Sequence, residues 1–238
     1  MIIGLAQYKF INGDTEFNLS QIKKAMETYS GKTELLCFGE SFLQGFDAIS
    51  GNYDDDKNVA VAIDSAEFDT ICTWSKEYNV AVLFGYSEKE DDSIYSSCAV
   101  ISRGEVIHNY RRTSIGWREP EWTSEHYKEG EEINTFSLND REFLIALCGD
   151  LWDTDWEKFK TDAIVLWPVY VTFDLDAWKE EEKEYAAQAS NVAEKVLMIN
   201  SICESQASIS HGGTFYFKSG DTISKLPYDA EDVLLVEV

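Results

Sequence analysis

Short apolar runs with strand character recur along the chain, and in its first third they alternate with amphipathic segments. Eight runs predict strands, at residues 2–7, 34–38, 80–85, 95–101, 105–110, 143–147, 163–167 and 196–200. Apolar positions three or four residues apart predict helices over 19–29, 68–78 and about 176–195. Strand–helix–strand alternation indicates an α/β sheet, whereas the runs around Arg103-Gly104 indicate an antiparallel hairpin. A mixed, layered α/β domain accommodates both.

Length and composition indicate one folded domain, residues 1–238. A chain of 238 residues with 44% hydrophobic and 13% aromatic residues can bury one sizeable core. It contains no internal repeat, Gly/Ser-rich linker or low-complexity tract. The short acidic runs at 54–56 and 180–182 are interpreted as solvated surface.

The charge balance argues against several classes of partner and site. With 44 acidic and 20 basic side chains, the net charge of −24 repels phosphate backbones and anionic lipid, so we expect neither nucleic acid nor membrane partners. No leader segment precedes Ile2 and no apolar run approaches ~20 residues, so we expect a soluble, cytoplasmic protein. Five scattered cysteines and three histidines form no CxxC, HxxxH or HExxH pattern. We expect no disulfide framework, metal or cofactor.

Cys148 stands where an apolar strand ends. Gly149-Asp150 then turns the chain toward a helix predicted over about 153–160, and Asp150 is interpreted as structural. A side chain at the carboxyl end of a strand lies where α/β folds bind ligands. A helix that follows would direct N–H groups at the sulfur, favouring the thiolate and offering donors to an oxyanion. The alternative is a small buried hydrophobe, which is our interpretation of the other four cysteines.

Glu40 follows the strand at 34–38 in the same way, within FGESFLQGF. Such a carboxylate is either a solvated loop residue or a group held over a pocket. If partly desolvated, it has a raised pKa and can act as a general base toward a thiol or a water.

Three separate segments together resemble the carbon–nitrogen hydrolase (nitrilase-like) superfamily. ELLCFGESFLQGF resembles its glutamate segment, HNYRRTSIG its YRK lysine segment, and FLIALCGDLWDTD the segment that carries the nucleophilic cysteine. Weaker matches, IIGLAQY, TDAIVLWP, VLMIN and HGGTFYF, extend the resemblance over nearly the whole chain. It implies a four-layer α–β–β–α sandwich that forms a homodimer through its sheet-flanking helices.

The resemblance also implies roles for individual residues. Glu40 matches the general base, Cys148 the nucleophile, and Gly149 the residue whose N–H helps to form the oxyanion hole. Arg112 stands at the position of the catalytic lysine, and Arg111 matches a structural, ion-pairing arginine. An arginine keeps the positive charge but cannot release a proton. It is therefore compatible with an adapted site, a slow enzyme or an inactive relative.

Further candidates follow from the same resemblance. The family often has a second glutamate after the lysine, which here is either Glu121 or Glu125; surface charge is the alternative. His211 suggests a Cys–His pair, but the family has a late strand there. Aromatic side chains in the loops that line the family's pocket, with core packing as the alternative, are Trp117, Trp152, Tyr170 and Phe173.

The implied activity is hydrolysis of a small, non-peptide C–N bond. The thiolate attacks a linear amide or N-carbamoyl compound, and water hydrolyses the resulting thioester. The alternatives are an inactive protein of this fold with a binding or regulatory role, and an acyltransferase that passes the acyl group to an amine. Anionic substrates would need compensating charge from Arg111, Arg112 or Arg118.

Overall fold

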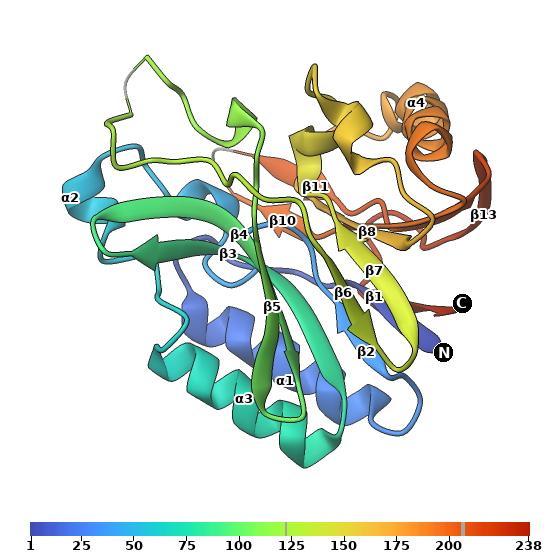
Figure 1. The fold of residues 1–238 in the computed structure, drawn as a ribbon, viewed down its shortest axis with the longest axis horizontal. Coiled ribbons are helices and arrows are strands. Elements are labelled where there is room, and N and C mark those ends of the chain that lie inside the picture. Colours follow the sequence, from blue (N-terminus) through green and yellow to red (C-terminus); the bar gives the residue numbers. More distant parts are fainter. Residues whose placement is uncertain (122, 206–207) are drawn as a thin grey trace.

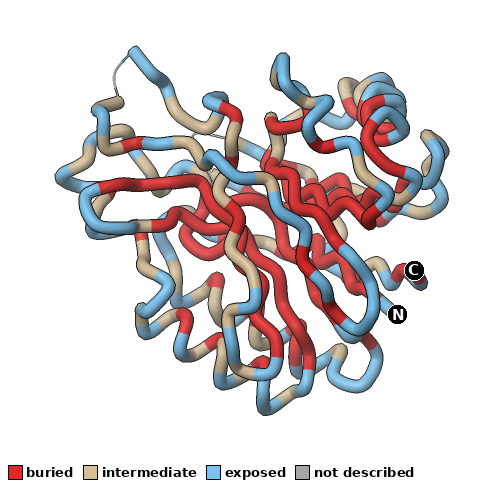
Figure 2. The backbone as a smooth tube through the Cα atoms, viewed as in Figure 1, coloured by how far each residue is buried: buried red, intermediate tan, exposed pale blue. Residues whose placement is uncertain are grey.

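The computed structural model describes residues 1–121, 123–205 and 208–238. Two six-stranded sheets lie face to face, with helices α1 (Thr15–Tyr29) and α3 (Ala66–Tyr78) outside the first and α4 (Trp178–Val192) outside the second (Figure 1). The predicted four-layer α–β–β–α sandwich is confirmed. Most of the buried backbone lies in the central strands of the two sheets (Figure 2).

Each sheet combines parallel and antiparallel pairs. The first has the order β14-β1-β2-β3-β4-β5 and the second β13-β12-β9-β8-β7-β6, while β10 pairs with β11. The strands of the first sheet are β1 (Ile2–Gln7), β2 (Leu35–Cys37), β3 (Ala81–Glu90), β4 (Ser93–Ser102), β5 (Glu105–Arg111) and β14 (Asp232–Glu237). Those of the second are β6 (Thr135–Leu138), β7 (Arg141–Ile145), β8 (Ile164–Val169), β9 (Lys195–Asn200), β12 (Phe215–Lys218) and β13 (Asp221–Lys225). The remaining elements are β10 (Ile202–Glu204), β11 (Ile209–His211), α2 (Tyr53–Asp56) and the 3₁₀ turns η1 (Phe46–Ala48), η2 (Ile115–Trp117), η3 (Cys148–Leu151) and η4 (Trp156–Phe159).

Local sequence explains where the helices lie. The Asp14 side chain accepts a hydrogen bond from the Phe17 N–H and so caps α1, whose buried side chains include Ile22 and Met26. Helix α3 ends at Asn79, which adopts a left-handed conformation with φ of 50°. Both helices pack on the outer face of the first sheet. Among the described residues, no helix is long and apolar enough to cross a membrane.

The eight strands and three helices expected from the sequence are present, with shifted ends. The helix predicted over 153–160 was wrong, because only the 3₁₀ turn η4 forms there. The strands that the apolar pattern missed are short or lie at sheet edges, so they do not present a buried face long enough to show a clear pattern: β6, β10, β11, β12, β13 and β14.

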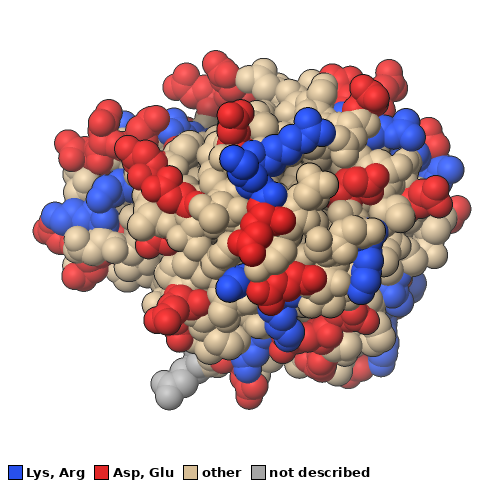
Figure 3. All heavy atoms as spheres, turned by 90° about the horizontal axis from the view of Figure 1, so that it is seen from below, with Lys and Arg blue, Asp and Glu red and all other residues tan. Residues whose placement is uncertain are grey.

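The acidic run 54–56 is only partly solvated surface, which corrects our interpretation. Asp56 is 1% exposed, and its carboxylate accepts hydrogen bonds from the Ser50 and Gly51 N–H groups and from the Tyr127 hydroxyl. Elsewhere, acidic side chains spread over the surface with basic ones between them, as on the face in Figure 3.

Strand direction brings the site together. Strands β1, β2 and β3 run parallel, as do β7, β8 and β9, and β5 runs in the direction of β3 because both are antiparallel to β4. The Glu40 N–H, just after β2, donates to the Val169 carbonyl at the end of β8, 3.3 Å away. The carboxyl ends of β2 and β8, from different sheets, therefore meet.

Candidate functional site

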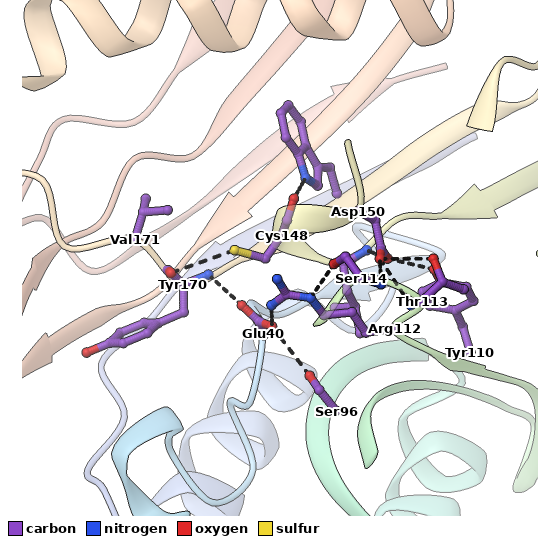
Figure 4. A network of polar contacts seen from close by, with 12 residues as sticks. Glu40, Ser96, Tyr110, Arg112, Thr113, Ser114, Cys148, Asp150, Tyr170 and Val171 are labelled. Atoms are coloured by element: carbon purple, nitrogen blue, oxygen red, sulfur yellow. Dashed lines mark hydrogen bonds and ion pairs between the residues drawn. The ribbon is translucent and has the colours of Figure 1, made fainter. Parts of the chain in front are cut away.

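Cys148 lies just beyond β7, on the first residue of the η3 turn. Its φ of 40° is unusual for a residue with a side chain, and such strain is most common at functional sites. Its carbonyl accepts a hydrogen bond from the Trp167 indole at 3.0 Å, and its Sγ lies 3.9 Å from the Tyr170 carbonyl oxygen (Figure 4). These contacts hold the partly exposed thiol at the meeting point of the two sheets.

The expectation of a thiolate favoured by a helix was wrong. Burial raises the pKa of the Cys148 thiol to about 12, and the negative charge of Glu40 raises it further, whereas Arg112 and the Tyr170 backbone act in the opposite direction. The 3₁₀ turn η3 has four residues, too short for the dipole of a long helix to offset desolvation. In the free protein Cys148 is therefore a thiol at neutral pH.

This protonation state makes alkylation of Cys148 dependent on pH. Because the thiolate is the nucleophile, we expect the rate with iodoacetamide to rise about tenfold per pH unit from pH 7 to 10, with no plateau near pH 9. Mapping adducts at limiting reagent measures this rate beside that of Cys72, which is also partly exposed. A plateau below pH 8 contradicts the expectation.

Glu40 is fully buried, not solvated, and each oxygen of its carboxylate is held by a different element. Oε1 accepts from the Arg112 guanidinium at 2.9 Å and from the Ser96 hydroxyl at 3.4 Å, while Oε2 accepts from the Tyr170 N–H at 3.2 Å. Gly85 permits this approach, since a β-carbon there would lie 2.7 Å from the Glu40 Cα. The carboxylate is thus fixed beside the thiol.

Arg112 is 3% exposed and forms a buried ion pair with Glu40. Its Nε donates to the Ser114 hydroxyl at 2.7 Å, and its Nη2 faces Gly149, where a β-carbon would lie only 2.3 Å away. In the described part of the chain, Nη2 has no hydrogen-bond acceptor. Burial lowers the pKa of Arg112, but the charges of Glu40 and Asp150 and the hydrogen bond to Glu40 outweigh it, so the pKa is raised and the cation is permanent.

Asp150 connects the arginine segment to the cysteine turn. Its Oδ1 accepts from the Thr113 and Ser114 N–H groups at 3.1 and 2.9 Å. Its Oδ2 accepts from the Leu147 N–H at 2.8 Å and the Tyr110 hydroxyl at 2.6 Å (Figure 4). The structural interpretation of this carboxylate agrees with these contacts. Sequence reasoning overlooked Ser114, although its position two residues after Arg112 was a usable signal.

The aromatic candidates differ in what they touch. Tyr170 contributes its backbone to the site, while its buried ring stacks on Phe46. Trp152 is 45% exposed and packs against Trp167 and Tyr185. The other two candidates were Phe173, which packs edge-on against Trp178 and Tyr185, and Trp117, which packs against Tyr127. Their contact with substrate stays a prediction.

The other charged candidates are exposed or already paired. Glu121 and Glu125 are exposed, and neither has a hydrogen bond or ion pair within the described residues, so the second glutamate stays a prediction. His211 Nδ1 lies 2.8 Å from Asp229. Arg111 has the ion-pairing role expected of it, since its guanidinium binds buried Glu88.

Comparisons with known proteins indicate the family of this chain. Residues 2–154 match the carbon-nitrogen hydrolase family. A glutamine-dependent NAD(+) synthetase of Aquifex aeolicus is 29% identical over 155 residues, 63% of this chain and 26% of that protein. An (R)-stereoselective amidase of Pseudomonas sp. is 28% identical over 153 residues, 63% of this chain and 52% of that protein. The chain thus matches between a quarter and about half the length of these relatives.

Solved structures share the fold at low identity. XC1258 from Xanthomonas campestris, a CN-hydrolase superfamily protein with an arsenic adduct in its active site, superimposes with a TM-score of 0.82 at 16% identity, over 99% of this chain and 89% of that one. The amidase from Nesterenkonia sp. AN1 superimposes with a TM-score of 0.80 at 18% identity, over 100% of this chain and 93% of that one. With the family match over residues 2–154, this chain belongs to the carbon-nitrogen hydrolase family.

Proposed function

We propose that this protein hydrolyses small, non-peptide C–N bonds, of linear amides or N-carbamoyl compounds, with Cys148 as nucleophile. The observation that carries the proposal is the arrangement around the Tyr170 backbone. Its N–H holds the Glu40 carboxylate, its carbonyl faces the Cys148 thiol, and Arg112 closes the other side of Glu40. A nucleophile, a base and a cation thus surround one point where the two sheets meet. We also propose that residues 1–238 act as one domain.

The reaction proceeds through a thioester. As Sγ of Cys148 bonds to the carbonyl carbon, Glu40 takes the thiol proton, because a thiol with so high a pKa does not ionise beforehand. The C–N bond then breaks, and Glu40 returns the proton to the departing nitrogen. Water next attacks the thioester with Glu40 again as base; the C–S bond breaks, and the acid and the free thiol are released.

Arg112 supplies charge and not protons in this scheme. Its Nη2 faces Gly149 and has no acceptor among the described residues, so it is available to an oxyanion beside Cys148. The Gly149 N–H is the second donor that we propose. A guanidinium stays protonated throughout, which leaves Glu40 as the group that transfers protons.

The thioester gives a direct test. We expect intact mass spectrometry after acid quench to show one acyl group added on incubation with a primary amide, together with ammonia release. Cys148→Ala should show neither, and Cys72→Ala, the matched control, should behave like wild type. Binding without adduct or ammonia supports the inactive alternative, and acyl transfer to added hydroxylamine without acid supports the acyltransferase. Homodimerisation stays a prediction.

A further inference from the structure

A hollow of about 170 Å³ lies beside the proposed catalytic residues. Two of its lining residues touch the site. A β-carbon at Gly116 would lie 3.0 Å from Nη2 of Arg112, and the Phe46 ring stacks on Tyr170, with centroids 5.1 Å apart. The hollow therefore lies next to Arg112 and Tyr170, which both contact Glu40.

Large apolar and aromatic side chains share its lining with small and polar residues. They are Phe46, Ile49, Trp117 and Tyr127, and the rings of the last two pack 6.1 Å apart between centroids. The buried Asp56 carboxylate binds the Tyr127 hydroxyl and so holds this ring in place. An apolar cavity of ~150 Å³ can hold a benzene ring. The hollow therefore matches a ring or a branched alkyl group.

Among the described residues, the lining of the hollow offers a carboxylate no unpaired cation. Arg118 lines it, but its guanidinium is held by both oxygens of Glu129, at 2.6 and 2.9 Å. Arg112, next to the lining, is paired with Glu40, and its remaining Nη2 is the donor proposed for the oxyanion, while Glu119 adds a negative charge to the lining. A carboxylate placed here meets paired arginines and a like charge, so it loses hydration without gaining a partner.

We propose that this hollow binds the acyl group of the substrate, and that the preferred substrate is a neutral primary amide with a branched or ring-sized apolar acyl group. N-carbamoyl amino acids and other carboxylate-bearing compounds are then poor substrates. The inference rests on the proposed function, because it takes Cys148 as the place where the carbonyl is attacked.

A matched pair of amides tests the preference. In 4-methylpentanamide a branched alkyl group stands where succinamate has a carboxylate, at the same distance from the amide. We expect kcat/KM for 4-methylpentanamide to exceed that for succinamate by at least about tenfold. L-glutamine and N-carbamoyl-phenylalanine, which also carry a carboxylate, should be as poor as succinamate. Equal rates within the pair overturn the proposal.

Two variants check that the hollow itself discriminates. Glu129→Gln frees the Arg118 guanidinium, so the preference should shift toward succinamate by about tenfold. Ile49→Trp fills the hollow and should lower kcat/KM for 4-methylpentanamide more than for acetamide. Ile223→Trp, at an exposed position on β13, is the control and should leave the ratios as they are. Unchanged ratios in both hollow variants place the acyl group elsewhere.

A binding measurement separates failure of this proposal from failure of the proposed function. Calorimetric titration of the Cys148→Ala protein with 4-methylpentanamide and with succinamate measures binding of the two amides without any turnover. Tighter binding of the neutral amide supports the hollow even if wild type hydrolyses nothing. No preference in binding overturns the hollow even if hydrolysis occurs.

Discussion

Replacing Arg112 with lysine is expected to lower kcat/KM on small amides by about 100-fold. The guanidinium is seated by contacts that an ammonium cannot reproduce together, at the Glu40 carboxylate and the Ser114 hydroxyl, with Nη2 directed at Gly149. A lysine that keeps the pair with Glu40 leaves the space beside Gly149 empty and removes one preorganised donor. Loss of such a donor typically costs ~100- to 1000-fold in rate.

Steady-state assays of wild type and Arg112→Lys over the same amides measure this effect. Arg103→Lys is the matched control, because Arg103 lies in the exposed turn before β5 whereas Arg112 follows the end of that strand. A rise in activity on substitution would mean that arginine blocks a site built for lysine. The adapted site would then be the wrong interpretation.

Glu40→Gln is expected to abolish turnover and also to lower the free energy of unfolding by about 3 kcal/mol. Both partners of the ion pair are almost completely buried, at 0% and 3% exposure, so the substitution leaves a permanent cation without its counter-charge. Removing one member of a buried pair typically costs ~3–5 kcal/mol. Because glutamine still accepts one hydrogen bond, we expect the loss of stability to lie at the lower end of this range.

A double variant separates the structural from the catalytic contribution. Glu40→Gln combined with Arg112→Met removes the unpaired cation, so stability should largely return while activity stays absent. Urea denaturation measures the stability, and Glu237→Gln, on an exposed glutamate of β14, is the control. Wild-type stability in the single variant would show that the buried pair does not contribute as argued. Activity in either variant would remove Glu40 from its proposed role as base.

The fold was predictable to the extent that it depends on buried strands and on motifs. Apolar runs located the eight strands that form most of the two sheets, because a buried strand needs apolar side chains over its whole length. Edge strands such as β13 were not predicted, since half of their side chains are solvated and their pattern resembles that of a loop. The helix predicted after Cys148 was wrong. Two short 3₁₀ turns form there instead, and such turns need no long amphipathic pattern.

The candidate site was only partly predictable. Cys148, Glu40 and Arg112 were identifiable one at a time, because each lies within three residues of the end of a strand, in a motif with a family resemblance. Their mutual contacts were not, because they depend on strand directions in two different sheets. The expectation that Cys148 would be a thiolate failed for the same reason, since desolvation is a property of everything packed around the sulfur.

By itself, the sequence determined the family and the layered α/β class, and it indicated candidate catalytic residues, because these follow from local patterns and motif order. The tertiary structure alone decided that Arg112 pairs with Glu40, that Asp150 joins the two segments, and that Arg118 is held by Glu129. The Arg112–Glu40 and Arg118–Glu129 pairs join residues 72 and 11 positions apart, and the Thr113 N–H that Asp150 binds lies 37 positions from it. Pairing partners and burial, which set charge and pKa, exist only once the chain has folded.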